Sequence, residues 1–597
     1  MMKESEKLLN YLTVPSVQQA EVIPTKNQFT FIAKMDKLPQ AWTLDHNDQP
    51  IPFGTFSDRV MSVYHSPQGD KAVIGVDDQG NEKQQLYLMI NNTSLKQEVL
   101  VYEPECFHHF GDWSPDGQSI VFSSNRRHPG YFDIFMMDVT TKDMKKIFTY
   151  DGNCTPLKWL NDNKHILISM QETNIDQAIY MLNIYTGQIT RIGAEDRRAR
   201  YQSVQLMKDA QGGYILTDLG EETLYISQLS FDQPHNVKKL VHHPTWDIEE
   251  ISLSPDETMM TYILNEGGIS RLYIYDIKKS QTKAIQDVPD GVIQSLAWLN
   301  HETCIFILKT PTMPGDIWQL NVVDETVERL TYISHSDSVG HLWVKPTLKT
   351  YTSFDGLDIP YFLYDKGDVK YKPAVVWVHG GPESQTRAEY NPVIQYLVEQ
   401  GFLVVAPNVR GSRGYGRTYI QLDDRRKRMD AVKDLAWLHK DLIQTHGVDK
   451  KRIGIIGRSY GGFMVLASLT HFPDLWGAGV NIVGISHFKT FLQNTGPWRR
   501  RLREFEYGSL KHDVDFFEDI APFNHTDRIK APLLMFHGEN DTRVPVSEAR
   551  QMMKNMKAQN KDVSLTVFPD EGHQTAKLKN HILMNRQIVQ FMMKHLT

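Results

Sequence analysis

The stretch "IGIIGRSYGGFM" (residues 453–464) runs from a short apolar segment into a serine flanked by glycines. Ser459 lies in "GRSYG" (457–461), which fits the GxSxG pattern of a tight turn between a strand and a helix. The glycines allow the sharp backbone path that projects the serine side chain outward. We therefore expect a strand, a turn at Ser459 and a helix from Tyr460, whose N-terminal dipole would favour negative charge near the serine.

Further apolar segments alternate with helical patterns throughout the C-terminal part of the chain. They are "AVVWV" (374–378), "FLVVA" (402–406), "IGII" (453–456), "LLMFH" (533–537) and "LTVF" (565–568). The alternation predicts a largely parallel sheet, and the near-continuous apolar character indicates burial on both faces. In such a sheet ligands bind beyond the carboxyl ends of the strands, so functional side chains should directly follow these segments.

Two side chains that could activate Ser459 follow later strands of this sheet. Asp541 comes after "LLMFH" in "GENDTRVP", and His573 comes after "LTVF" in "PDEGHQ". A serine hydroxyl needs a base within hydrogen-bond reach, and in this fold the chain order is serine, acid, histidine. The sequence therefore predicts Ser459, Asp541 and His573 as a catalytic triad. The other candidates are a rival acid, two loop caps and a histidine of the C-terminal helix: Glu539, Asp570, Glu571 and His581.

The segment "VVWVHGGPESQ" (375–385) offers a site for the oxyanion of a tetrahedral intermediate. Its two adjacent glycines, Gly380 and Gly381, let backbone N–H groups point at a reacting oxygen. The backbone N–H of Tyr460, directly after the serine, is the other expected donor. Candidates for the nucleophile, the acid, the base and the oxyanion donors are all present in the expected places. The sequence therefore predicts that Ser459 is a nucleophile and not only a small residue in a turn.

The N-terminal half repeats a unit of a polar turn followed by a strand. "DWSPDGQSIVFSSN" (112–125) matches "YHSPQGDKAVIGVDD" (64–78) and "SLSPDETMMTYILN" (252–265), with degenerate copies at 158–171 and 297–310. Proline presets the turn, and Asp or Asn accepts a backbone hydrogen bond there. Units of about 45 residues predict a seven-bladed β-propeller, whose ring closure removes exposed edges. A two-sheet sandwich is the alternative.

Composition and length describe a large globular protein. The 597 residues exceed one ordinary core, and a net charge of −7 gives no reason to expect nucleic acid or an anionic membrane as partner. No apolar run reaches about 18 residues, and the N-terminus lacks the apolar region of a signal peptide. Cys106, Cys154 and Cys304 form neither a disulfide framework nor a metal spacing, which predicts a cytoplasmic protein.

We predict three parts: a helical N-terminal segment over residues 1–20, the propeller over 21–335 and an α/β-hydrolase domain over 336–597. Triad chemistry needs neither a metal nor an organic cofactor, so none is expected. The oligomeric state is left open, and a homo-oligomer is compatible with the sequence.

On its motifs the chain resembles the prolyl oligopeptidase superfamily of serine peptidases along essentially its whole length. The matching segments are "HGGPESQ" (379–385), "NVRGSRGYG" (408–416), "GRSYGGFM" (457–464), "HGENDTRVPVSEA" (537–549) and "DEGH" (570–573). This resemblance implies a serine peptidase acting on short peptides, with the propeller shielding a central cavity from folded proteins.

The resemblance also bears on the substrate site. His379 stands where the superfamily pattern has a tyrosine, and the "HGGP" form is similar to the acylaminoacyl-peptidase branch. That similarity implies the N–H of Gly381 as the second oxyanion donor, with Gly380 as the fallback. Arg543 matches a family arginine that contacts substrate; the alternative is a salt-bridged structural arginine.

Several alternatives stay open. A dipeptidyl-type activity is disfavoured because the paired-glutamate segment of that branch is missing, and the acidic pairs 221–222 and 249–250 are interpreted as solvated. The arginines of 499–503 are interpreted as a solvated face, although they could attract a substrate carboxylate. Aromatic residues between 488 and 507 fit either a substrate pocket or the core. Aminopeptidase, carboxypeptidase, endo-oligopeptidase, carboxylesterase and non-catalytic scaffold functions are the remaining hypotheses.

Overall fold

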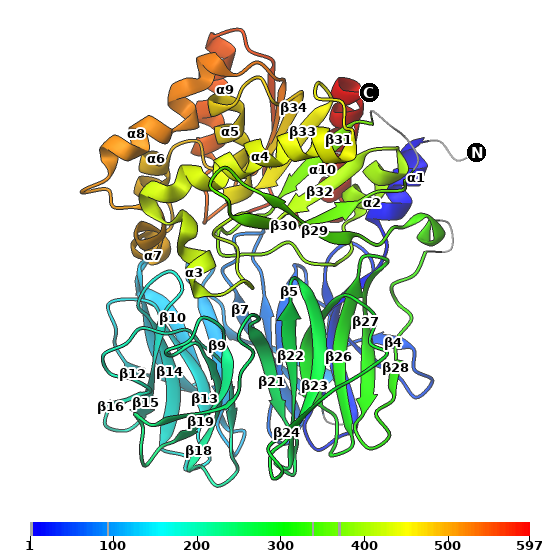
Figure 1. The fold of residues 1–597 in the computed structure, drawn as a ribbon. Coiled ribbons are helices and arrows are strands. Elements are labelled where there is room, and N and C mark those ends of the chain that lie inside the picture. The colour runs from blue at the N-terminus through cyan, green and yellow to red at the C-terminus, as the bar shows by residue number, and fades with distance from the viewer. Residues whose placement is uncertain (1–3, 92–94, 337–338, 368–371) are drawn as a thin grey trace.

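The computed structural model describes residues 4–91, 95–336, 339–367 and 372–597. Figure 1 shows a ring of β-sheets from the N-terminal half below an α/β domain from the C-terminal half. The N-terminal helix α1 (Glu4–Leu12) lies beside the α/β domain and not in the ring. The predicted combination of a β-propeller and an α/β-hydrolase domain is confirmed.

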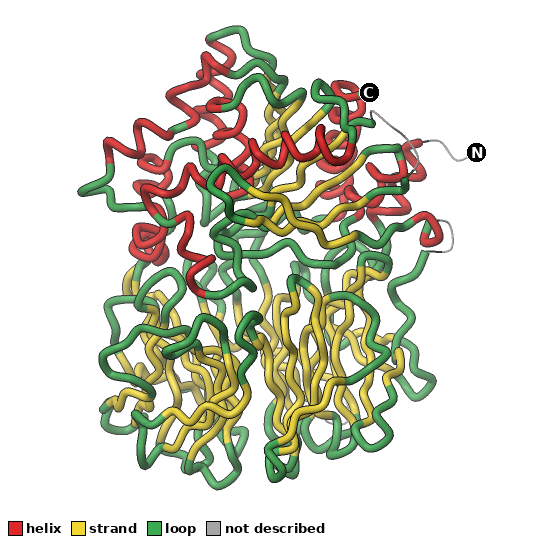
Figure 2. Tube along the Cα trace, viewed as in Figure 1, coloured by secondary structure: helices red, strands yellow, loops and turns green. Residues whose placement is uncertain are grey.

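The described residues of the ring form seven four-stranded antiparallel sheets, each built from strands consecutive in the chain. Figure 2 shows these strands in yellow. The blades are β1–β4 (Ser16–Ile23, Gln28–Lys34, Gln40–Leu44, Pro50–Pro52), β5–β8 (Val60–His65, Lys71–Val76, Gln85–Asn91, Leu95–Val101), β9–β12 (His108–Trp113, Ser119–His128, Tyr131–Asp138, Met144–Phe148), β13–β16 (Cys154–Trp159, His165–Gln171, Gln177–Asn183, Ile189–Ile192), β17–β20 (Tyr201–Leu206, Gly212–Thr217, Tyr225–Ser230, Val237–Val241), β21–β24 (Ile248–Leu253, Met259–Glu266, Ile269–Asp276, Gln281–Ala284) and β25–β28 (Val292–Trp298, Thr303–Thr310, Met313–Asn321, Val327–Arg329).

The repeated polar turns connect the first and second strands of the blades. In the third blade Ser114 accepts the N–H of Gly117 through its backbone oxygen, and its hydroxyl donates to Asp116 at 2.6 Å. The first strand begins at Ser16, before the predicted boundary at residue 21. The boundary was misplaced because β1 carries the polar residues Gln18, Gln19 and Glu21, which hide its strand pattern.

The first and last blades meet through apolar side chains. Val17 and Phe31 of the first blade pack with Ile305 and Ile317 of the last. In the part of the chain that the structure describes, no strand is hydrogen-bonded across this seam. Side-chain packing therefore closes the ring.

The described part of the C-terminal domain has an eight-stranded sheet in the order β29-β30-β32-β31-β33-β34-β35-β36. The pairs β29–β30 and β30–β32 are antiparallel, and the other neighbours are parallel. The strands are β29 (Thr347–Thr352), β30 (Asp358–Tyr364), β31 (Ala374–Val378), β32 (Leu403–Pro407), β33 (Ile453–Arg458), β34 (Ala478–Ile482), β35 (Leu533–Gly538) and β36 (Val563–Phe568).

Helices cover both faces of this sheet, which explains its apolar strands. One face packs against α4, α5 and α9, and the other against α1, α2 and α10. The helices after α1 are α2 (Pro392–Glu399), α3 (Arg417–Ile420), α4 (Arg428–His446), α5 (Tyr460–His471), α6 (Phe488–Asn494), α7 (Pro497–Tyr507), α8 (Val514–Ile520), α9 (Ser547–Ala558) and α10 (Leu578–Leu596), with 3₁₀ turns η1 (Gly340–Leu342), η2 (Gln421–Asp423), η3 (Arg425–Lys427) and η4 (Pro522–Arg528). Among the described residues, no helix combines the length and the apolar character needed to span a bilayer.

Candidate active site

Ser459 sits between β33 and α5 at a sharp backbone turn. Its φ of 58° and ψ of −117° lie in a region that non-glycine residues rarely adopt. The flanking glycines are required by space: a Cβ on Gly457 would lie 2.1 Å from the backbone oxygen of Gly461, and one on Gly461 would lie 2.4 Å from that of Val378. The GxSxG turn therefore presents the serine at the carboxyl end of the sheet.

Asp541 and His573 meet beyond the ends of β35 and β36. His573 Nδ1 lies 2.8 Å from Asp541 Oδ2. Because a carboxylate only accepts, Nδ1 carries the proton and Nε2 is left free to act as a base. The other carboxylate oxygen accepts the backbone N–H groups of Arg543 and Val544, both at 2.9 Å.

Burial and neighbouring charge adjust both groups. Burial raises the pKa of Asp541, but His573 and the hydrogen bonds from His537 and His573 more than offset it and hold the carboxyl pKa well below its usual range. Burial lowers the pKa of His573, and Arg458 and Arg543 add to this effect against the attraction of Asp541. At neutral pH the pair is therefore a carboxylate beside a neutral imidazole.

Arg458 connects the serine turn with the histidine loop. Arg458 directly precedes Ser459 in the chain, and its guanidinium donates to the backbone oxygen of His573. Within the described residues, no hydrogen bond joins the Ser459 hydroxyl to His573. Hydrogen bonds of this kind are often long without substrate and tighten in the reacting complex.

The glycine turn 379–381 lies against the serine. A Cβ on Gly380 would be 3.4 Å from the Cβ of Ser459. His379 fixes the turn, with Nδ1 2.7 Å from the Gly380 oxygen and Nε2 2.8 Å from the Ser412 hydroxyl. Burial lowers the pKa of His379 to about 4. The imidazole is thus uncharged at neutral pH, and its two ring nitrogens contact the Gly380 oxygen and the Ser412 hydroxyl, which itself donates to the backbone oxygen of Val409 at 2.6 Å.

The rival residues have other partners. Glu539 pairs with Arg550 at 2.6 Å. Glu571 accepts the backbone N–H groups of Ala576 and Lys577 ahead of α10, and His581 lies on α10 beside Asn585. Among all the acids and histidines proposed for the triad, the described structure hydrogen-bonds only Asp541 and His573 to each other.

Residues 388–597 match the Prolyl oligopeptidase family, and residues 57–302 match the TolB beta propeller domain. Over residues 388–597, the chain belongs to the prolyl oligopeptidase family. A solved structure from a study of two prolyl endopeptidases has a TM-score of 0.87 at 18% identity, covering 99% of this chain and 91% of that one. A puromycin-hydrolyzing peptidase of Mycobacterium tuberculosis has a TM-score of 0.86 at 15% identity, covering 100% and 96%. At these identities the likeness establishes the fold.

Curated relatives of the superfamily carry more than one name. Dipeptidyl aminopeptidase BIII of Pseudoxanthomonas mexicana is 33% identical over 36% of this chain and 32% of its own length. The acylamino-acid-releasing enzyme of Rattus norvegicus is 26% identical over 49% of this chain and 37% of its own length. The chain thus spans between about a third and two fifths of the length of the first curated relatives it matches.

Arg543, the residue matched to the superfamily's substrate-contacting arginine, reaches the propeller. Its Nε lies 2.6 Å from an oxygen of Glu82, in the loop between β6 and β7. The same loop touches the histidine loop, since a Cβ on Gly572 would lie 1.9 Å from the Gly80 oxygen. It also accepts from Asn540 through the backbone oxygen of Gln79 at 3.1 Å. No local sequence signal joins Glu82 to Arg543, because 461 residues separate them.

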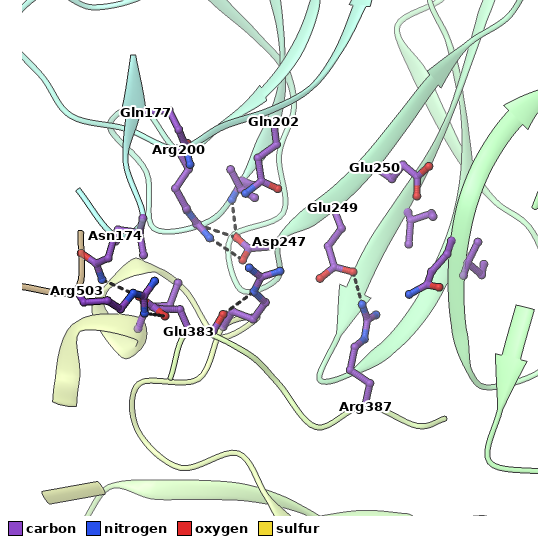
Figure 3. A pocket seen from close by; sticks show the side chains of 17 residues that line it. Asn174, Gln177, Arg200, Gln202, Asp247, Glu249, Glu250, Glu383, Arg387 and Arg503 are labelled. Carbon is purple, nitrogen blue, oxygen red and sulfur yellow. Dashed lines mark hydrogen bonds and ion pairs between the residues drawn. The ribbon is translucent and has the colours of Figure 1, made fainter. Parts of the chain in front are cut away.

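A cavity of about 400 Å³ lies between the two domains and reaches Glu383, two residues after the glycine turn. Figure 3 shows Arg503 and Glu383 at one side and the pair Glu249–Arg387 at the other. The interpretation of 249–250 as solvated is wrong: Glu249 pairs with Arg387 at 2.6 Å, and both glutamates line the cavity. The error arises because Glu249 finds its partner in the other domain and Glu250 in the next blade, at Leu296, which local sequence does not reveal.

The aromatic residues of the 488–507 segment belong mainly to the core. Phe488, Phe491 and Tyr507 are almost completely buried and pack on one another. Trp498 instead contacts Phe107 of the propeller, with ring centroids 5.4 Å apart.

One group of acids in the described residues has the spacing of a metal site: Asp423, Asp424 and Glu506. The guanidinium of Arg428 pairs with both Asp423 and Glu506 inside this group. Because an internal cation already balances these carboxylates, the group fits an ion-pair network better than a metal centre.

Proposed function

We propose that this chain is a serine peptidase that cleaves short peptides through an acyl-enzyme on Ser459. The observation that carries the proposal is the hydrogen bond between His573 and Asp541, next to a serine in a strained GxSxG turn. The pairing leaves Nε2 of His573 unprotonated, as a general base requires. The curated relatives that bear peptidase names support the same reaction class.

In the proposed reaction, His573 removes the Ser459 proton while Asp541 fixes its tautomer and stabilises the imidazolium. Ser459 then attacks the peptide carbonyl. The backbone N–H of Tyr460 and that of Gly381, or of Gly380 beside it, hold the oxyanion. His573 next protonates the leaving amine, and water releases the acyl group by the reverse route. The nucleophile, the base, the acid and the oxyanion donors all belong to the chain, and water is the only other reactant besides the peptide.

Among peptidase modes we propose the acylaminoacyl type, in which the substrate's N-terminus is blocked. A free ammonium would need an unpaired carboxylate, yet the cavity acids Asp247, Glu249 and Glu383 have cationic partners. Glu250 accepts from the Leu296 N–H, and burial raises its pKa to about 7. At pH 7 a large fraction of the Glu250 carboxyl groups is therefore protonated and neutral. The acylamino-acid-releasing enzymes among the relatives support this choice.

The test combines a fluorophosphonate probe with matched chromogenic peptides that carry an acetylated or a free N-terminus. We expect labelling of the wild type, preference for the acetylated peptide, and loss of both in Ser459→Ala. The exposed Ser57→Ala is the control. Preference for the free N-terminus would indicate an aminopeptidase, and labelling with cleavage of esters only would indicate a carboxylesterase. An unlabelled wild-type protein would favour the non-catalytic scaffold.

A further inference from the structure

Helix α7 begins beside the loop that carries Asp541. Thr495, just before the helix, donates its hydroxyl to the backbone oxygen of Arg543 at 2.7 Å, and the Gly496 N–H donates to the backbone oxygen of Thr542 at 3.3 Å. The first turns of α7 contain four arginines and no acidic residue. A basic helix start is thereby fixed against the candidate active site.

These arginines have different surroundings. Arg501 is exposed, in agreement with the interpretation as a solvated face. Arg500 donates to the backbone oxygen of Gln493 at 2.7 Å. Arg503 pairs with Glu383 at 3.3 Å in the cavity, as Figure 3 shows. The interpretation is therefore wrong for Arg503, because α7 turns that side chain inward.

Arg499 differs from the exposed Arg501 in that it is partly buried and still has no partner among the described residues. Among the described residues its guanidinium has neither a hydrogen bond nor an ion pair, and its Nη1 is buried. Its Cζ lies 5.5 Å from the ring centroid of Trp498. Burial lowers the pKa of Arg499 to about 9, and the positive charges of Arg503 and Arg543 add to the effect. The side chain is thus half-buried, with one guanidinium nitrogen enclosed and no carboxylate to balance its charge.

The charged groups around Arg499 are already paired with other residues. Arg503 is paired with Glu383, and Arg543 with Glu82. Asp541 lies within electrostatic reach of Arg499, but its oxygens are taken by His573 and by two backbone N–H groups. One positive charge is therefore left over beside the catalytic pair.

The local structure opposes this arrangement. A cation in the first turn of a helix is repelled by the helix dipole, and Arg499 and Arg503 are like charges four residues apart. Burying a guanidinium without a partner is unfavourable as well. Strained charges of this kind gather at functional sites, where a ligand supplies the missing partner.

We propose that Arg499 binds a carboxylate of the peptide substrate. The planar guanidinium matches a carboxylate with two parallel hydrogen bonds, so it selects that group over a neutral amide. A peptide presents carboxylates in two places, at its C-terminus and on acidic side chains. The inference rests on the proposed peptidase function and names a substrate class for the same site.

The test uses two matched substrate pairs. In the first pair, one peptide has Glu and the other Gln directly before the scissile bond. In the second pair, one peptide ends in a free carboxylate and the other in a carboxamide. We expect one pair to show a preference for the carboxylate member, and Arg499→Gln to reduce that preference by about 10- to 100-fold, the range of a charge-assisted hydrogen bond. Arg501→Gln is the matched control, since its side chain is solvated, and should retain the preference.

The outcomes separate the inference from the proposed function. Preference within the first pair assigns the subsite to an acidic side chain, and preference within the second assigns it to the C-terminus. Equal cleavage within both pairs, or equal losses for both members in Arg499→Gln, overturns the inference while the peptidase assignment stands. Protection of Ser459 from the fluorophosphonate probe by the same peptides measures occupancy of the site by a readout separate from product formation. Arg499→Lys keeps the charge and provides a second variant if Arg499→Gln does not fold.

Discussion

The two halves of the candidate active site depend on different parts of the molecule. The Ser459 turn and the glycine turn are held within the α/β domain, by Val378, His379 and Ser412. The loops of Asp541 and His573 also rest on the propeller, at Gly80 and Glu82. The comparison indicates that the turn of the proposed nucleophile is formed by one domain, whereas the loops of the proposed acid–base pair are completed by contact between two.

The largest effect is expected from removing the proposed nucleophile, whose turn is formed by the α/β domain alone. Ser459→Ala should lower kcat/KM by about 10⁴- to 10⁶-fold, because no other group takes over the covalent step. The thermal unfolding midpoint should stay close to that of the wild type, since alanine adds no atoms. Peptidase activity retained in this variant would falsify the assignment of the nucleophile.

The next effect concerns the propeller contact. In Gly80→Ala the new Cβ would lie 2.8 Å from the backbone nitrogen of Gly572, so the His573 loop must move. We expect kcat/KM to fall by about 100-fold, as small displacements of catalytic groups do. Gly220→Ala is the matched control, because Gly220 has a similar φ of 77° but its Cβ would meet only Arg197 at 3.8 Å. Equal losses in both variants would mean that backbone strain and not loop contact is responsible.

A smaller effect is expected from the ion pair that joins the domains. Glu82→Gln removes the partner of Arg543 and should reduce kcat/KM by about 3- to 10-fold, because the arginine is then less well ordered. Glu221→Gln, which breaks the surface pair with Lys239, should leave the rate unchanged. Steady-state kinetics on one peptide compares the two, and an unaffected Glu82→Gln variant would separate Arg543 from catalysis.

The smallest effect is that of pH. Burial lowers the pKa of His573 below its ordinary value of 6.5, so the imidazole loses its proton at lower pH and is free to act as a base. The rate should therefore increase with pH and level off, rising less than about twofold between about pH 6.5 and 7.5. A pH profile of kcat/KM measures this, and an apparent pKa above 6.5 would contradict it.

Local chemistry explains what could be predicted from the sequence. The turn at Ser459 needs glycines for steric reasons, and Asp541 and His573 directly follow apolar strands, so each leaves a short signal. The blades were predictable because each repeats one polar turn. Glu82 and Arg387 left no signal, because their partners lie in the other domain and pairing across such distances follows from packing. The same holds for Arg499, whose isolation depends on where its neighbours find their partners.

The position of α1 has a consequence for the order in which the chain can assemble. Leu8 and Tyr11 of α1 are buried against α2 and α10, and Tyr11 donates to Glu399 at 2.9 Å. Helix α10 is formed by residues 578–596, which leave the ribosome long after α1. At roughly 5 to 20 residues per second, about half a minute or more separates the two. During that time the apolar face of α1 lacks part of its docking site, so the ring can form before the helix that precedes it in the chain is in place.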